Sequence, residues 1–154
     1  MLKHLVYEKP IRIHFGHCDP AGIVYHPQYY IILNELMEDF LGDVMGVGFI
    51  EIRKYGVGFP VAGIRTDFAA PSRPGDECIG RCWIEHVGTS SIRFAFTIEC
   101  AQTGELRLRC IETCVCVRQN EQGELGAVPI PEELRAKMTP YVKAADEPAL
   151  ELRA

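Results

Sequence analysis

The stretch QYYIILNELMEDFLGDV, residues 28–44, decides the fold. Pro27 stands directly before it and suits the first turn of a helix, where its missing N–H leaves nothing unsatisfied. Apolar side chains recur at helical spacing in two stripes: Tyr29, Leu33, Leu36, Phe40 and Val44, and then Tyr30, Met37 and Leu41. A helix that is apolar around most of its girth must be enclosed by other parts of the protein. In one short domain the obvious enclosure is a curved sheet, so we expect a sheet wrapped around this helix.

The rest of the chain supplies strands for such a sheet. Apolar and polar residues alternate over residues 11–15, and turn-forming residues follow at 17–22. Four more strands are predicted over 61–69, 77–87, 91–100 and 106–118, with a hairpin turn at 102–104. A short helix is expected near Pro131, and the residues after about Ala145 are expected to be loosely ordered. The sequence therefore predicts an α+β domain, an antiparallel meander with the helix on its concave face.

Composition excludes several function classes. The chain has 154 residues, of which 47% are hydrophobic and 24% charged, which is ordinary for one globular domain. The formal charge of −5 argues against binding to nucleic acid, whose partners are usually basic. The longest apolar run, residues 29–33, is far too short to cross a bilayer, and the first ten residues do not resemble an export signal. We therefore expect a cytoplasmic protein without nucleic-acid or membrane partners.

The seven cysteines do not form a recognisable metal or disulfide framework. No C-x-x-C pair occurs and the number is odd, so we interpret them as small buried hydrophobic residues in a reducing compartment. Cys110, Cys114 and Cys116 would share one strand face, which leaves a soft metal site as the alternative. No metal is expected.

The chemistry is concentrated in HCDPAGIVYHPQYY, residues 17–30. Asp19 lies there in a tight loop just before a helix N-terminus, which offers free N–H groups and a partial positive charge. A carbonyl oxygen at that terminus would be polarised, and a nearby carboxylate could attack the carbonyl carbon or activate a water. Pro20 and Gly22 allow a sharp turn and a close approach to a ligand. The pattern suits acyl transfer.

Other interpretations of this stretch remain open. An aspartate before a helix is often only an N-cap or a turn former. Cys18 could be a nucleophile, but adjacent side chains on an extended strand point apart, so its neighbours provide no obvious activating base. His14, His17 and His26 could suggest zinc, but their spacing fits no usual ligand pattern.

The stretch FGHCDPAGIVYHPQY, residues 15–29, resembles the signature of the 4-hydroxybenzoyl-CoA thioesterase family of hotdog fold. Residues 67–71, 75–76 and 87–91 resemble later blocks of that family, so the resemblance covers about 10–119. It implies one hotdog domain over 1–154, with a C-terminal helix and tail after the core. It also implies that Asp19 is the catalytic carboxylate and that the backbone N–H of His26 polarises the carbonyl. The active site would lie at a dimer interface, with the pantetheine arm of the thioester between subunits.

Two departures from the family pattern bear on the substrate. The family's type enzyme has an acid on the long helix where this chain has Asn34, which we expect to be buried with a structural or substrate-positioning hydrogen bond. The type enzyme also has a basic cluster where this chain has residues 87–89, so Arg93 and Arg118 are candidate substitutes for holding the phosphates of coenzyme A. The full set of candidate substrate-binding residues is Gly22, Tyr25, Asn34, Phe59, Pro60, Ser90, Ser91 and Arg93.

The function expected from these observations is hydrolysis of an acyl thioester to free acid and thiol, with Asp19 as nucleophile or general base. The substrate would be an acyl-CoA or an acyl-carrier thioester, with no cofactor other than the coenzyme A of the substrate. The enzyme would be a homodimer or homotetramer. The alternatives are a non-catalytic acyl-thioester binding module and a hotdog enoyl-thioester hydratase.

Overall fold

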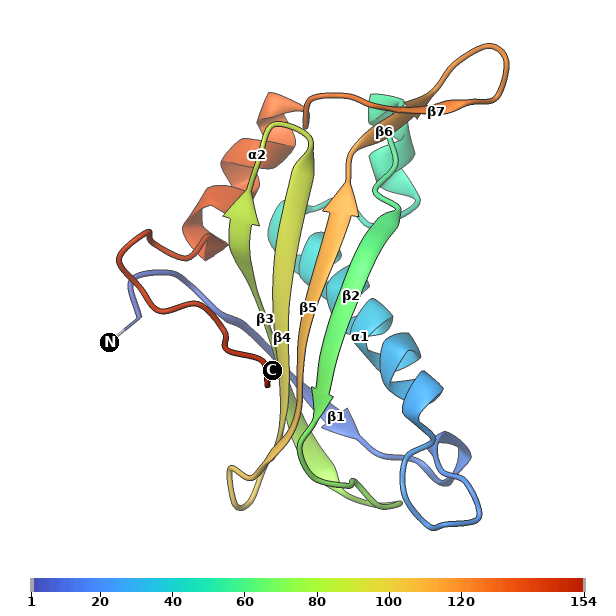
Figure 1. The fold of residues 1–154 in the computed structure, drawn as a ribbon, viewed down its shortest axis with the longest axis vertical. Coiled ribbons are helices and arrows are strands. Elements are labelled where there is room, and N and C mark those ends of the chain that lie inside the picture. The colour runs from blue at the N-terminus through green and yellow to red at the C-terminus, as the bar shows by residue number, and fades with distance from the viewer. Residues whose placement is uncertain (1, 154) are drawn as a thin grey trace.

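A computed structural model describes residues 2–153 as one antiparallel sheet wrapped around one long helix (Figure 1). The sheet has five strands in the order β1-β3-β4-β5-β2, and β2 therefore lies at one edge. Its strands are β1 (Tyr7–Arg12), β2 (Val61–Phe68), β3 (Glu77–Val87), β4 (Ser91–Cys100) and β5 (Leu106–Val115). The predicted hotdog arrangement, a curved sheet around an enclosed helix, is confirmed.

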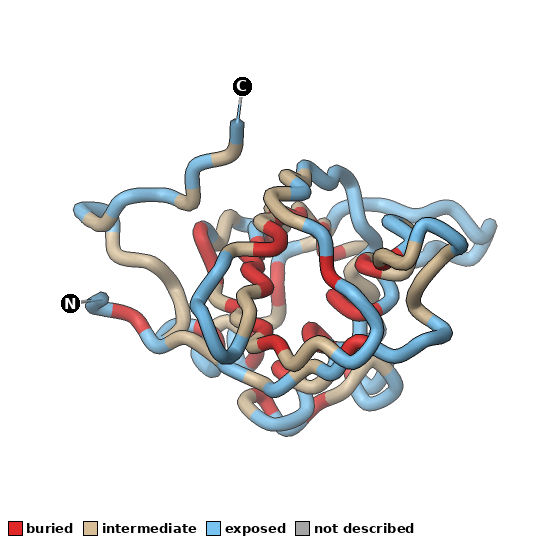
Figure 2. The backbone as a smooth tube through the Cα atoms, turned by 90° about the horizontal axis from the view of Figure 1, so that it is seen from below, coloured by how far each residue is buried: buried red, intermediate tan, exposed pale blue. Residues whose placement is uncertain are grey.

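The helix α1 (His26–Phe40) occupies the concave face, and a single π-helical turn extends it over Leu41–Met45. Gly46, at φ 64°, ends it in the left-handed conformation that favours glycine. The apolar stripes predicted from the sequence face inward, and most of the buried segments coloured in Figure 2 lie around the middle of the molecule. Opposite them, the inward residues of β4 are Ile92, Phe94, Phe96 and Ile98, all buried.

The strand ends of β3 and β4 agree with the predicted ones, because both strands alternate cleanly and are separated by a short turn. The turn between β4 and β5 is also where it was expected, with Gly104 at φ 72°. The predicted strand at 106–118 is interrupted after Val115, and its last part forms β6 (Val117–Gln119), which pairs with β7 (Leu125–Ala127).

The first strand lies earlier than its pattern indicates. The alternation predicts a strand over residues 11–15, but β1 ends at Arg12, and Phe15 begins a 3₁₀ turn with its side chain 86% exposed. The reason is the β1–β3 register, which runs from Tyr7 opposite Cys82 to Arg12 opposite Glu77. Glu77 is the first residue of β3, so the chain beyond Arg12 has no strand to pair with and turns away.

The C-terminal segment covers the end of the core at which α1 finishes. It then crosses the convex face of the sheet. The helix α2 (Glu132–Met138) buries Leu134 and Met138 against the end of α1, so the expected helix after Pro131 is present. The tail was expected to be loosely ordered from about Ala145, and the structure contradicts this.

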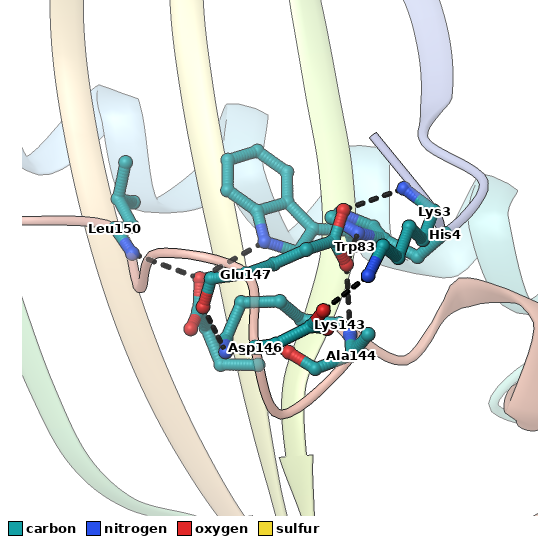
Figure 3. A network of polar contacts seen from close by, with 9 residues as sticks. Lys3, His4, Trp83, Lys143, Ala144, Asp146, Glu147 and Leu150 are labelled. Carbon is teal, nitrogen blue, oxygen red and sulfur yellow. Dashed lines mark hydrogen bonds and ion pairs between the residues drawn. The ribbon is translucent and has the colours of Figure 1, made fainter. Parts of the chain in front are cut away.

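Side chains distant in sequence hold the tail (Figure 3). Glu147 lies 2.8 Å from Nδ1 of the buried His4, and the Lys3 and Ala144 N–H groups donate to its two carboxylate oxygens. The Leu150 N–H and the indole N–H of Trp83 both donate to Oε1 of Glu85, at 3.0 Å each. His4 and Trp83 lie far from the tail in sequence, so these contacts could not be read from a local pattern. None of the helices in residues 2–153 is long and apolar enough to span a bilayer.

Candidate active site

The Asp19 loop is a tight turn built by its own hydrogen bonds. The Gly22 N–H donates to the Asp19 carbonyl at 2.9 Å, and the Asp19 N–H donates to the Ile23 carbonyl at 3.1 Å. Gly22 adopts φ 75°, which explains why glycine stands there. The Ala21 N–H donates to Oδ1 of Asp19 at 2.8 Å. Asp19 is therefore a turn former, but this bond uses only part of the accepting capacity of its carboxylate.

The same loop leads directly into the start of α1. A bridge between Cys18 and Val24 closes the loop, and the Tyr25 N–H donates to the His17 carbonyl at 2.9 Å. This pairing places the Asp19 turn beside Tyr25 and His26, the N-cap and first residue of the helix. Within residues 2–153, the His26 N–H has no hydrogen-bond acceptor. A free helix-terminal N–H and a carboxylate thus lie at the two ends of one short loop, and such an N–H is able to polarise a carbonyl group.

A buried arginine holds the neighbouring loop against this one. Nη1 of Arg107 contacts the Pro71 carbonyl at 2.8 Å, the Ser72 hydroxyl at 3.2 Å and Oδ2 of Asp76 at 2.8 Å. The Ser72 carbonyl accepts from the Val24 N–H at 3.0 Å. Arg107 therefore holds the loop of residues 71–76 in place. Through the Ser72 carbonyl, that loop holds one side of the Asp19 loop. The sequence did not reveal this role, because Arg107 stands in a strand and its partners lie over thirty residues earlier.

Aromatic side chains connect the helix start to the sheet edge. Phe68, the last residue of β2, has its ring centroid 6.1 Å from that of His26 and 5.8 Å from that of Tyr29. One turn along the helix, the Tyr30 hydroxyl donates to the Thr66 hydroxyl of β2 at 3.1 Å. Tyr25 is exposed beside them. The start of α1 thus lies beside the end of the edge strand β2.

Several other predicted substrate residues lie at the opposite end of the sheet. The Ser90 carbonyl accepts from the Cys116 N–H at 2.6 Å, and the Pro60 carbonyl accepts from the Val115 N–H at 3.1 Å. Ser91 begins β4, whereas Asp76, next to the Asp19 loop, precedes β3 at the other end. The ten residues of β4 between these ends span about 30 Å. Within one chain, the structure does not bring this group to Asp19 (Figure 1).

Phe59 and Arg93 have distinct surroundings at that far end. Phe59 is half-buried and lines a small apolar cavity of about 50 Å³ with Met37, Leu41 and Phe94. Arg93 is exposed on the convex face, where it lines a groove of about 460 Å³ with Arg65 and the tail residue Leu150. A cavity of this kind suits an apolar group, and the groove carries two arginines together with the carboxylate of Glu85.

Asn34 is exposed, and the expectation that it is buried was wrong. No hydrogen-bond partner for its side chain lies within residues 2–153. Asn34 is one turn beyond Tyr30, whose hydroxyl bonds to β2, so this face of the helix runs beside the open sheet edge. The rest of its stripe is enclosed, since Met37 and Leu41 are buried, but Asn34 lies at the margin of the stripe next to the exposed Ile31 and Glu38.

Four cysteines were weighed as a possible nucleophile or as possible metal ligands, and all four are free thiols. The Cys18 thiol contacts the His14 carbonyl at 3.7 Å, and burial together with the Asp19 carboxylate raises its pKa. A raised pKa disfavours the thiolate that a nucleophile needs. Cys110, Cys114 and Cys116 are buried and unpaired. Within the described part of the chain, no three His, Cys, Asp or Glu side chains gather in a metal-binding group.

A second acid lies inside the core and was also missed. Glu112 of β5 is on the concave face and only 7% exposed, and its carboxylate accepts a weak hydrogen bond from the Cys114 thiol at 3.7 Å. No Lys, Arg or His of residues 2–153 forms an ion pair with it, and burial raises the pKa of this carboxyl. The sequence did indicate this position, because Glu112 falls at the two-residue spacing of the inward-facing residues of that strand.

Comparisons with known proteins agree with this geometry. The sequence model of the thioesterase-like superfamily matches residues 13–138. The chain is 26% identical over 112 residues to the putative acyl-CoA thioesterase YneP of Bacillus subtilis (strain 168), covering 73% of this chain and 80% of that protein. A 1,4-dihydroxy-2-naphthoyl-CoA thioesterase from Synechocystis superposes with a TM-score of 0.78 at 21% identity, over 93% of this chain and 99% of that one.

A mutant 4-hydroxybenzoyl-CoA thioesterase in complex with 4-hydroxybenzoyl-CoA superposes equally well. Its TM-score is 0.78 at 22% identity, over 86% of this chain and 98% of that one. The resemblance to that family found in the sequence is thus confirmed. The superfamily match runs from Ile13, ahead of the Asp19 loop, to Met138 at the end of α2. The chain therefore belongs to the thioesterase-like superfamily and is a thioesterase of the hotdog fold.

Proposed function

We propose that this thioesterase hydrolyses acyl-CoA to free acid and coenzyme A, using the Asp19 carboxylate and the His26 N–H. The observation that carries the proposal is the shared loop in which a partly exposed carboxylate adjoins an unpaired helix-terminal N–H. The names of the similar proteins support the substrate class, since each of those names specifies an acyl-CoA compound. The reaction needs no cofactor beyond the coenzyme A of the substrate.

Each group has a defined task in this reaction. The thioester carbonyl oxygen accepts a hydrogen bond from the His26 N–H, and the helix terminus stabilises the charge that develops on that oxygen. Asp19 either attacks the carbonyl carbon to form an anhydride, or takes a proton from a water that attacks. The thiolate then leaves with the electron pair of the broken C–S bond and takes up a proton. On the first route a water next hydrolyses the anhydride, which releases the free acid and restores the Asp19 carboxylate. Arg107 acts only through the loop that it positions.

The second half of the site comes from a partner protomer in this proposal. β2 is an edge strand with Val61, Ile64 and Phe68 at 51%, 39% and 45% exposure. An unpaired apolar edge is a ready surface for pairing with another strand. If two β2 strands pair antiparallel about a two-fold axis, the far end of one sheet meets the Asp19 end of the other. Ser90, Ser91, Phe59 and Pro60 of one protomer would then approach Asp19 and His26 of its partner.

Arginines near this edge provide positive charge for the phosphates of coenzyme A. Arg65 and Arg93 line the groove on the convex face beside β2, and Arg118 donates to the Gly56 carbonyl at the far end. In a protein with a net charge of −5, such a local cluster would favour an anionic arm at this place. We assign the phosphates to this end and the acyl group to the space beside α1. The expected cytoplasmic location fits the seven free cysteines and stays a prediction.

A panel of acyl-CoA thioesters, assayed for released thiol, tests the activity. Turnover of several members that is lost in Asp19→Asn supports the proposal. Stoichiometric binding of acyl-CoA without thiol release would instead indicate a binding module, and water addition to an enoyl-CoA would indicate a hydratase. Single turnover in oxygen-18 water tests the anhydride route, because label enters the Asp19 carboxylate only when water hydrolyses an anhydride at that carboxyl carbon.

A complementation experiment tests the shared site. Asp19→Asn and Ser90→Glu variants are each expected to be poorly active alone, the second because its added charge repels the phosphates. Mixed dimers contain one site with both native halves, so an equal mixture should recover about a quarter of the native sites. Light scattering should show at least a dimer at micromolar concentration. A monomer, or a mixture no more active than its parts, would contradict the two-protomer site but not the hydrolysis itself.

A further inference from the structure

Cys78 and Cys100 face each other across the sheet. Cys78 is the second residue of β3 and Cys100 is the last residue of β4, and the two are direct Cα partners in the antiparallel register. Directly opposite residues project from the same face, so both thiols lie on the concave side at the Asp19 end of the sheet.

The hydrogen bonds around this pair show which kind of pair it is. The Ala101 N–H donates to the Glu77 carbonyl at 2.9 Å, whereas the Cys100 N–H donates to the Glu105 carbonyl at 2.8 Å. The backbone of Cys100 therefore bonds toward β5 and not toward Cys78, which makes Cys78 and Cys100 a non-hydrogen-bonded pair. Such pairs have Cα atoms about 4.5 Å apart. A disulfide accepts Cα separations of about 4.4–6.8 Å, so the pair meets this requirement without moving the strands.

The two thiols differ in the way that a reactive and a resolving cysteine differ. Cys100 is half-buried at the β4–β5 turn, within reach of a small solute, whereas Cys78 is 1% exposed. Hydrogen-bond donors of Thr103 and Gln102 in the β4–β5 turn lower the pKa of Cys100. Burial raises the pKa of Cys78. A thiolate is the form that peroxides attack, so oxidation is expected to begin at Cys100.

We propose that Cys78 and Cys100 form a reversible disulfide driven by a peroxide. The Cys100 thiolate attacks one peroxide oxygen and becomes a sulfenic acid as the O–O bond breaks and hydroxide leaves. The Cys78 thiol then attacks the Cys100 sulfur, the S–S bond forms, and the sulfenic oxygen leaves with the Cys78 proton as water. Two electrons pass from the two sulfurs to the peroxide, and a dithiol reductant reverses the change. This redox site is independent of the proposed hydrolysis.

The sequence allows a clean test by peptide mapping. Trypsin cuts after Arg65, Arg81, Arg93 and Arg107 but not before Pro74, so Cys78 lies alone in residues 66–81 and Cys100 alone in 94–107. The intact protein would be treated with hydrogen peroxide, alkylated, digested and analysed by mass spectrometry. We expect a linked pair of these two peptides that disappears after dithiothreitol.

Three variants sharpen the result. Cys100→Ser should abolish the linked pair, and Cys78→Ala should leave a Cys100 sulfenic acid that dimedone traps. Cys82→Ala is the matched control, since Cys82 is as buried as Cys78 on the same strand but faces Phe96, and it should keep the linked pair. If Cys78→Ala fails to fold, the peptide map of the native protein and that of Cys100→Ser still decide whether the disulfide forms. The proposal is overturned if Cys100 proceeds to a sulfinic acid without linkage, or if Cys18 supplies the linked partner.

Discussion

The two ends of the five-stranded sheet are held together by different means. At the Asp19 end, Arg107 joins the Pro71 carbonyl, the Ser72 hydroxyl and the Asp76 carboxylate in one partly buried polar network. At the far end, α2 and the segment before it bury Ile130, Leu134 and Met138, and Phe59 packs beside an apolar cavity. Hydrogen bonds are directional and fix positions, whereas apolar packing tolerates adjustment. The end that needs a fixed loop geometry is thus the one built from polar contacts.

The largest expected effect is that of Asp19→Asn on the chemistry at the first end. Asparagine keeps an oxygen for the Ala21 N–H, so the turn should survive, but the base or nucleophile is lost. We expect kcat to fall at least about a hundredfold with little change in melting temperature. Glu38→Gln, an exposed acid on the outer face of α1, is the control and should retain activity. Native turnover by Asp19→Asn would remove Asp19 from the mechanism.

Next in size is the effect of Arg107→Met on the framework of the same end. The change removes the contacts of Nη1 and leaves the Asp76 carboxylate without its cation, at a cost of about 2 kcal/mol after allowance for solvent screening. Because the loop also holds Val24, kcat should fall as well. The control is Arg109→Met, in the same strand but 3.8 Å from its acid, which should cost much less. Equal losses in the two variants would argue against a special role for Arg107.

The pH dependence gives a second check on this network. The Arg73 N–H and then Arg107 lower the pKa of Asp76 below its usual 3.8. A lowered folded-state pKa contributes stability above the unfolded-state value and loses it as pH falls through the folded-state value. The difference in unfolding free energy between native protein and Arg107→Met should therefore be full at neutral pH and shrink below pH 3.8.

Glu112 lies between the two ends of the sheet. Its effect on the unfolding free energy should change with pH in the opposite direction to that of Asp76. Burial raises the folded-state pKa of this carboxyl above 4.5, so the fold disfavours its ionised form and loses stability as pH rises through the folded-state value. Glu112→Gln removes this penalty and should stabilise the protein near neutral pH by about 1 kcal/mol. Urea unfolding at several pH values measures the difference, which should vanish below pH 4.5. A variant that is less stable at every pH would show that the carboxylate has a partner that stabilises it.

Local pattern was sufficient for much of this fold. Strands β3 and β4 were predicted with their true ends because each alternates without interruption between turns. The Asp19 loop and the helix start were also found together, since they are close neighbours in the chain. The register of β1 was not predictable from its own residues, because the start of β3 at Glu77 decides where pairing stops.

The missed features depend on contacts between residues far apart in sequence. Arg107 reaches back to Ser72, and Glu147 reaches His4, across 35 and 143 residues respectively. Asn34 was misplaced for a related reason: most of its stripe is buried, but Asn34 lies at the margin of the stripe, on the side of the helix where the sheet ends at β2. Whether a face is covered is a property of the assembled sheet. In the proposed site, the contribution of the partner protomer depends further on how two sheets meet. No local pattern in the sequence specifies that arrangement.

The smallest expected effect concerns Asn34 and the choice of acyl group. Asn34 is exposed beside the edge at which we place the acyl group, so it could contact substrate without first breaking an internal bond. A neutral amide lacks the charge that makes hydrogen bonds to a phenol about twice as strong, so it should distinguish hydroxylated from plain aryl groups only weakly. We therefore expect the native kcat/KM values for 4-hydroxybenzoyl-CoA, benzoyl-CoA and medium aliphatic acyl-CoAs to be comparable.

The variant Asn34→Asp tests this expectation on the same substrates. It should shift the ratio of kcat/KM for 4-hydroxybenzoyl-CoA over benzoyl-CoA upward by about fivefold, because a charged acceptor contributes about 1 kcal/mol more. Glu35→Gln, the adjacent exposed residue of the helix, is the control and should leave that ratio unchanged. A strong native preference for 4-hydroxybenzoyl-CoA would place another group at the phenol. An unchanged ratio in Asn34→Asp would place the acyl group away from this side of α1.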